Sequence, residues 1–148
     1  MLIKVGYQIV FLGDEISDIS SERSSPGAKI LALQVLGGGA GGCAGALVGG
    51  MSVYLVMTIT GWGEEGSLFS PRALGAYIGA GFGYSVGSAL GVWGVGKVAG
   101  RKGALPQTLL GTAVGTLAGY ALWARTNTVS FFVGPVVGSV IGYNWSEP

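Results

Sequence analysis

The sequence contains no histidine, one cysteine, and charged residues at only 10%, against roughly 25% in an ordinary soluble domain. Without histidine the chain lacks the commonest general base and the commonest metal ligand. The single cysteine, Cys43, excludes an internal disulfide, and its place among glycines favours a small packing residue over a reactive thiol. A formal net charge of +1 offers no basic surface for phosphates, so we expect no nucleic-acid partner.

The carboxylates all lie outside the long apolar stretches of the chain. Glu64 and Glu65 are adjacent and would point in different directions, which favours a solvated loop over an acid–base pair. A proton-carrying rotor or a carboxylate-based pump needs an acid within a span, and none is present there. We therefore predict a protein that is not an enzyme, without catalytic, cofactor-binding or metal-binding residues and without a cofactor.

Apolar residues are abundant, at 49% of the 148 residues, and the mean hydropathy is positive. This composition is typical of a membrane protein. The length allows a single domain or one bundle of four spanning helices, and no break in composition divides the chain into two domains.

Glycine recurs at every fourth position in each of four apolar stretches. Residues four apart share one face of an α-helix, so each run would leave a groove that a second helix can approach closely. The expected helix-packing residues are Gly37, Gly41, Gly45 and Gly49; Gly75, Gly79, Gly83, Gly87 and Gly91; Gly111, Gly115 and Gly119; and Gly134, Gly138 and Gly142.

Such a density of glycine favours a lipid environment. In water, a glycine inside a helix costs about 1 kcal/mol relative to alanine, which would leave a soluble bundle weakly held. In lipid, helices associate through close packing of small residues, as in GxxxG motifs. The grooves either pack helices within one molecule or leave a face for a homo-oligomer or other membrane helices, and both alternatives stay open.

The predicted fold class is therefore all-α, an integral membrane helical bundle. We expect spans over 27–60, 72–98, 107–123 and about 129–143, which together form a four-helix glycine-zipper domain over 27–148. Pro26, Pro71 and Pro106 stand at or before the start of three of these segments, where the missing N–H of proline costs nothing. Pro135 is expected to kink the last segment.

We expect residues 1–26 to form an N-terminal amphipathic segment and linker. Apolar residues from Leu2 to Ile19 are spaced alternately by three and four, which predicts an amphipathic helix on the membrane surface. The alternation of Ile3, Val5 and Tyr7 is the competing pattern of a strand.

The charges predict a topology for four spans. Six of the eight basic residues, namely Lys4, Arg23, Lys29, Lys97, Arg101 and Lys102, would lie on one side of the membrane, with Arg72 and Arg125 on the other. In a membrane that follows the positive-inside rule, this places both termini and the central turn in the cytoplasm. Lys97 is expected to extend to the interface rather than to take part in ion coupling.

Two further patterns have a structural and a functional interpretation. Hydroxyls within the spans, such as Ser85, Thr112 and Thr116, either bond to their own helix backbone or line a path. The spacing of Gly37, Gly39 and Gly42 matches GxGxxG, which is the alternative hypothesis of a soluble or peripheral nucleotide-binding protein using this loop. That motif requires a preceding strand and a series of alternating strands and helices, and the apolar stretch through Thr60 does not supply the series.

The glycine periodicity from Gly37 to Gly142 resembles the glycine-zipper domains of bacterial envelope proteins. Four short grooved spans in a chain of this length also resemble the Tim17/Tim22/Tim23 class of organelle translocase proteins, whose signature Gly81 and Tyr84 would open. The arginine and aspartate of that signature are absent, and Val95 stands at the arginine position. From the residues themselves we predict a non-enzymatic membrane protein whose GxxxG-packed helices form a compact, oligomeric bundle with a structural role or a pore and translocation role.

Overall fold

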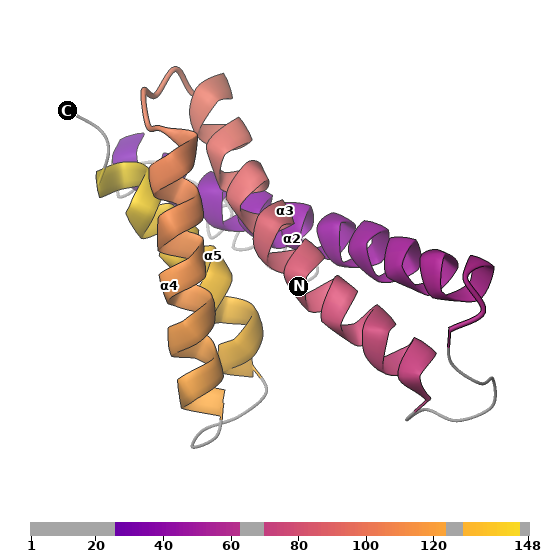
Figure 1. Ribbon diagram of the computed structural model, residues 1–148. Helices are drawn as coiled ribbons and strands as arrows, with labels where there is room; N and C mark the ends of the chain where they lie inside the picture. The colour runs from indigo at the N-terminus through magenta and orange to yellow at the C-terminus, as the bar shows by residue number, and fades with distance from the viewer. Residues whose placement is uncertain (1–25, 63–69, 124–128, 146–148) are drawn as a thin grey trace, which may run out of the picture. The chain divides into compact units, whose positions relative to one another are not determined.

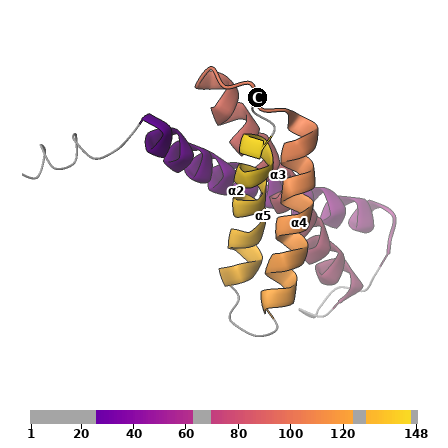
Figure 2. The ribbon, with the colours of Figure 1, turned by 90° about the vertical axis from the view of Figure 1, so that its left-hand side faces the viewer.

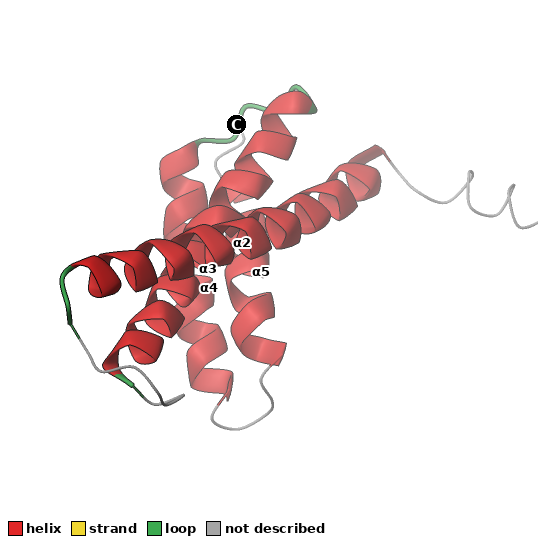
Figure 3. Cartoon of the chain, turned by 90° about the vertical axis from the view of Figure 1, so that its right-hand side faces the viewer, coloured by secondary structure: helices red, strands yellow, loops and turns green. Residues whose placement is uncertain are grey.

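The computed structural model describes residues 26–62, 70–123 and 129–145. Within these ranges the chain is all-helical, with four helices and no strand, which confirms the predicted helical class (Figure 3). The helices are α2 (Pro26–Ile59), α3 (Pro71–Val98), α4 (Leu105–Trp123) and α5 (Val129–Trp145) (Figure 1). The predicted amphipathic N-terminal segment lies outside the described residues.

The chain divides into two compact units, residues 1–31 and 32–148. In the first unit the described residues begin at Pro26 and are helical. The second unit contains the remainder of α2 together with α3, α4 and α5, and it carries the contacts between helices.

Prolines and glycines set the helix ends where the sequence predicts them. Pro71 occupies the first turn of α3, and the hydroxyl of Ser70 caps that helix by accepting a bond of 3.2 Å from the Ala73 N–H. After α2 and α3 the chain turns through Gly61 and Gly100, whose φ values of 71° and 76° lie in the left-handed region that favours glycine. Pro135 lies within α5, where it is fully buried.

Two antiparallel hairpins make up the second unit. The first hairpin is α2 from Ala32 onward with α3, and the second hairpin is α4 with α5, which lie side by side in two views (Figures 1 and 2). The hairpins meet because α3 contacts both α4 and α5.

The distribution of side chains is the reverse of that in a soluble bundle. Among the described residues, 32 large apolar side chains are exposed, whereas the buried apolar residues are Tyr84, Ala89, Val92, Val136 and Tyr143. The buried interior otherwise contains Pro135, glycine and polar residues, the polar ones being Gln34, Ser88, Thr108, Thr112 and Ser139. In α4 the buried residues are two threonines and a glycine, whereas the exposed ones include Leu109, Leu110, Val114, Leu117 and Leu122.

One described helix is long and apolar enough to cross a membrane. This is Gly27–Ile59, and only 6% of its most apolar 18-residue window is buried, unlike the core helix of a soluble protein. The apolar helix Val129–Trp145 is shorter.

Candidate functional site

The glycine run of α2 lies directly against that of α3. Gly41 meets Gly87, and each step of four residues forward in α2 is matched by four residues back in α3, so that Gly45 meets Gly83. A Cβ atom added at Gly45 would lie 2.9 Å from the Gly83 carbonyl carbon and 3.0 Å from the Gly87 Cα. Further along, Gly49 meets Gly79, while Gly37 and Gly91 contact each other at one end and Gly75 packs against Met57 at the other.

The glycine runs of α4 and α5 pair in the same way. Gly111 lies against Gly138 and Gly142, and Gly115 lies against Gly134 and Gly138. A Cβ added at Gly115 would lie 2.9 Å from the Gly138 Cα. Gly119 approaches Gly134 and the carbonyl oxygen of Ser130. The expected packing glycines are therefore all brought into contacts between helices of this one chain.

These contacts differ from ordinary side-chain packing because the neighbouring atoms belong to the backbone. A side chain that meets another flexible side chain can be accommodated by a rotamer change, but a Cβ that meets a carbonyl oxygen can be accommodated only if the helices separate. Substitution of any one of these glycines with a larger residue would therefore move the two helices apart and weaken all the contacts between them, not only the contact at that position.

Several glycines outside the predicted runs also make close contacts. Gly38 packs against Val92 and Val136, and Gly42 packs against Tyr84 and Ser88. Gly96 and Gly103 both lie against the ring of Tyr143, which is fully buried. The sequence does not single out these positions. Gly38 and Gly42 are four residues apart but run beside the longer series from Gly37 to Gly49, Gly96 and Gly103 lie outside any such series, and the side chains beside all four come from distant parts of the chain.

Polar groups join the two hairpins. The Tyr84 hydroxyl donates to the Phe132 carbonyl oxygen at 3.0 Å, and the hydroxyls of Ser85 and Thr116 share a bond of 3.2 Å. Asn144 Nδ2 donates to Gln34 Oε1 at 3.0 Å and to the Val140 carbonyl oxygen. These bonds link α3 with α4 and α5, and α2 with α5.

The buried hydroxyls are mainly bonded to their own helices. Thr108, Thr112 and Thr116 each donate to the carbonyl oxygen four residues earlier, at 2.7–2.9 Å. Ser139 donates to Val136 at 2.8 Å. Because these donors are used within the helices, they do not present a continuous polar path for a solute.

Removing either side chain of the Gln34–Asn144 pair is expected to change the stability by a different amount. Gln34 is fully buried, and its Nε2 has no hydrogen-bond partner among the described residues. Asn144→Leu removes the one described partner of the Gln34 side chain, so we expect it to lower the free energy of unfolding by about 1–3 kcal/mol. Gln34→Leu removes the unbonded amide itself and leaves Asn144 bonded to Val140, so we expect a loss of less than about 1 kcal/mol.

Unfolding of the detergent-solubilised chain with sodium dodecyl sulfate, followed by circular dichroism, measures both changes. The double variant should be about as stable as Gln34→Leu alone. A larger loss for Gln34→Leu than for Asn144→Leu would show that the Gln34 amide makes a stabilising bond beyond the one to Asn144.

Charged groups are confined to the ends of the described helices. No aspartate or glutamate occurs in any of the four helices. Lys97 is exposed in the last turn of α3, with its Nζ 6.0 Å from the centroid of the Trp93 ring, and Arg101 and Lys102 follow in the turn to α4. At the other end of α3, Arg72 Nε donates to the Trp62 carbonyl oxygen at 3.3 Å.

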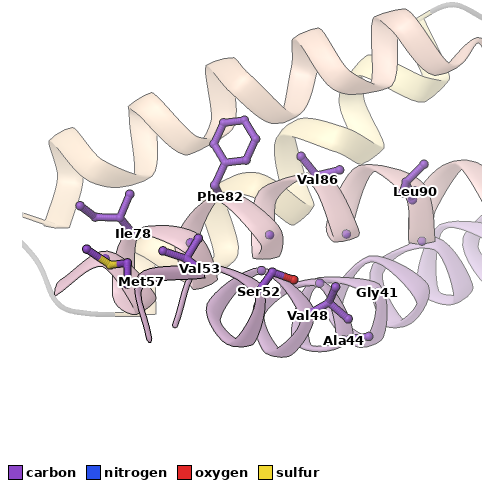
Figure 4. Close-up of a pocket in the computed structure, with 17 residues that line it drawn as sticks. Gly41, Ala44, Val48, Ser52, Val53, Met57, Ile78, Phe82, Val86 and Leu90 are labelled. Atoms are coloured by element: carbon purple, nitrogen blue, oxygen red, sulfur yellow. The ribbon is translucent and has the colours of Figure 1, made fainter. Parts of the chain in front are cut away.

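An apolar groove runs along the first hairpin (Figure 4). It has a volume of about 1110 Å³, with glycines of both helices on its floor. Ile78, Phe82 and Val86 belong to its α3 wall, and Val48 and Ser52 belong to its α2 wall (Figure 4). The groove offers apolar contact and almost no hydrogen-bonding groups, which suits a hydrocarbon chain or another apolar helix rather than a polar substrate.

The GxGxxG match has no phosphate-binding geometry. Gly37, Gly39 and Gly42 lie within α2, and the preceding residues 30–36 are helical rather than a strand. The motif requires a strand, a tight loop and then the N-terminus of a helix, whose free N–H groups hold the phosphate. Cys43, on the same helix, is exposed rather than packed between helices.

Comparison with known proteins does not add a family to these observations. No family model, curated protein or solved structure matches the chain.

Proposed function

We propose that this chain is a multi-pass integral membrane protein whose two glycine-packed hairpins serve a structural, non-enzymatic role. The observation that carries the proposal is the reversed distribution of side chains, with large apolar residues outside and glycine and uncharged polar groups inside. If the chain were soluble, water would contact these exposed apolar side chains, which is unfavourable. In a membrane the same side chains would contact the lipid tails, which are equally apolar.

The helix lengths support four spans. At 1.5 Å per residue, α4 with 19 residues and α5 with 17 extend about 28 Å and 26 Å, close to a hydrocarbon core of about 30 Å. The helices α2 with 34 residues and α3 with 28 extend about 51 Å and 42 Å, so they would tilt or continue into the interface. The basic turn with Lys97, Arg101 and Lys102 favours a cytoplasmic location for the α3–α4 connection.

The glycine contacts support a compact bundle as the functional unit. Because the glycine runs are paired within the chain, a homo-oligomer would have to use surfaces beside these contacts, and the apolar groove whose floor the glycines of α2 and α3 form is one such surface. Its occupant in an assembly would be a helix of a second copy or of another membrane protein. A pore or translocation role is the alternative, and it would require several copies, because the threonine hydroxyls inside one copy are bonded to backbone carbonyl oxygens of α4 and of the residue before it.

Extraction of membranes with alkaline carbonate tests the location. We expect the protein to remain in the membrane pellet, whereas a peripheral protein would be released into the supernatant. Release into the supernatant would contradict the proposal and would restore the soluble alternatives, including nucleotide binding, which thermal stabilisation by a nucleotide would then detect.

Reconstitution into liposomes distinguishes the structural role from the pore. For a structural bundle we expect the release of an encapsulated dye or ion to stay at the level of protein-free vesicles. Release that rises with the ratio of protein to lipid would support the pore. The number of copies is read from the mass of the detergent-solubilised complex by light scattering.

A further inference from the structure

An aromatic cavity lies on the opposite face of α3 from the groove wall. Its volume is about 360 Å³, and its aromatic lining consists of Tyr77, Tyr84, Trp123, Phe131 and Phe132. These five residues come from α3, α4 and α5, and the remaining lining residues are alanine and glycine. The structural role proposed above does not require this cavity.

The ring of Phe132 is nearly perpendicular to the rings of both Tyr84 and Phe131. Tyr84 and Phe132 have ring centroids 5.4 Å apart and an interplanar angle of 83°. Phe131 and Phe132 have centroids 5.5 Å apart and an angle of 90°. The hydrogen bond from the Tyr84 hydroxyl to the Phe132 backbone oxygen, at 3.0 Å, holds the first pair in place. The cavity therefore has preformed walls in different planes.

The chemistry of this lining restricts what can bind. Among the described lining residues none carries a charge, and the hydroxyl proton of Tyr84 is already donated to the Phe132 carbonyl oxygen. A flat ring with polar substituents would need parallel aromatic faces and a free hydrogen-bonding group. A compact cation with an apolar surface needs only ring faces around it, since their negative quadrupole attracts the charge.

We propose that this cavity binds a quaternary ammonium group, of which the trimethylammonium group of choline is the representative. Tyr77 is six residues from the start of α3, about 9 Å at the helical rise, and Trp123 is the last residue of α4. In the proposed membrane bundle, the cavity thus extends from near the ends of α3 and α4, a depth that both a phosphatidylcholine headgroup and free choline can reach, inward to Tyr84, which is 13 residues from the start of α3.

Trp123 provides the readout. In the full-length chain with Trp62→Phe, Trp93→Phe and Trp145→Phe, Trp123 is the remaining tryptophan, and its emission is followed in maltoside detergent while choline is added. The control ligand is 3,3-dimethylbutan-1-ol, the uncharged carbon analogue of choline. We expect a saturable change in emission, with choline bound about tenfold more tightly than its analogue.

Variants locate the site. Tyr77→Leu and Phe132→Leu should each weaken choline binding several-fold, whereas Phe82→Leu, an exposed aromatic residue on the groove wall of the same helix, should leave it unchanged. The proposal is overturned if choline produces no saturable change, if the analogue binds as tightly, or if Tyr77→Leu binds choline as the parent does.

Two bilayers of different composition distinguish a lipid headgroup from free choline as the ligand. Choline is titrated against the protein in nanodiscs of phosphatidylcholine and in nanodiscs of an uncharged glycolipid. Weaker apparent binding in phosphatidylcholine supports the headgroup as the ligand, because it competes with choline. Equal binding in both supports the free cation.

Discussion

Replacement of Gly83 with leucine is expected to separate the first hairpin and to lower the free energy of unfolding in detergent by more than about 3 kcal/mol. A Cβ at Gly83 would meet the Gly45 carbonyl oxygen, and it would lie 2.8 Å from the Gly45 carbonyl carbon and 3.1 Å from the Gly49 Cα. Since all of these atoms belong to the backbone of α2, a rotamer change cannot relieve the overlap. Unfolding by sodium dodecyl sulfate, followed by circular dichroism, measures the loss.

Gly94→Leu is the matched control on the same helix. A Cβ at Gly94 meets nothing within 4 Å, so leucine there changes the helix propensity without disturbing a contact. Because leucine is a better helix former than glycine, we expect the stability of Gly94→Leu to be unchanged or higher by up to about 1 kcal/mol. Equal stability for Gly83→Leu and Gly94→Leu would mean that the backbone contact between α2 and α3 does not hold the hairpin together.

Replacement of Val114 with aspartate is the second change with a large expected effect. Val114 stands at the middle of α4 with 67% of its surface exposed. At the centre of a spanning helix, an aspartate costs about 2.5–3.5 kcal/mol. On the surface of a soluble protein, the same change would be within about 0.5 kcal/mol of neutral. We therefore expect Val114→Asp to reduce the fraction of the protein that remains in membranes after carbonate extraction.

Val98→Asp is the corresponding control at a helix end. Val98 is 92% exposed and follows Lys97 at the end of α3, where the proposed topology reaches the interface. We expect the fraction of Val98→Asp that remains in membranes after carbonate extraction to equal that of the parent chain. If Val114→Asp also behaved as the parent does, the outward face of α4 would be in contact with water and α4 would not be a span.

Local signals in the sequence were sufficient to predict the helices. The predicted segment 72–98 differs from α3 by one residue at its start, and 107–123 differs from α4 by two, because Pro71 and Pro106 mark the first turns. Among the described residues, length and hydropathy identify one segment, Gly27–Ile59, as long and apolar enough to cross a membrane. The glycines of α3 lower its mean hydropathy, although they are the residues that bring its backbone against α2.

The pairing of the helices was not predictable from periodicity. Four runs with one period are compatible with several pairings, and the register in which Gly41 meets Gly87 depends on the turn between α2 and α3 as well as on the glycines. The aromatic cavity was also beyond sequence reasoning. Tyr77, Trp123 and Phe131 belong to three helices, and only the contact of the two hairpins brings their rings together.

The lone cysteine permits the most direct test of the central claim that lipid surrounds the outward faces. Cys43 is exposed and stands at the middle of α2, about 25 Å along the helix from either end. A membrane-impermeant maleimide, applied to both sides of native membranes, should not label Cys43, and it should label the thiol after denaturation in detergent. In a Cys43→Ala background, Val98→Cys at the end of α3 should be labelled without denaturation. Labelling of Cys43 in native membranes as fast as that of the cysteine at position 98 would contradict the account, because it would place the middle of α2 in water.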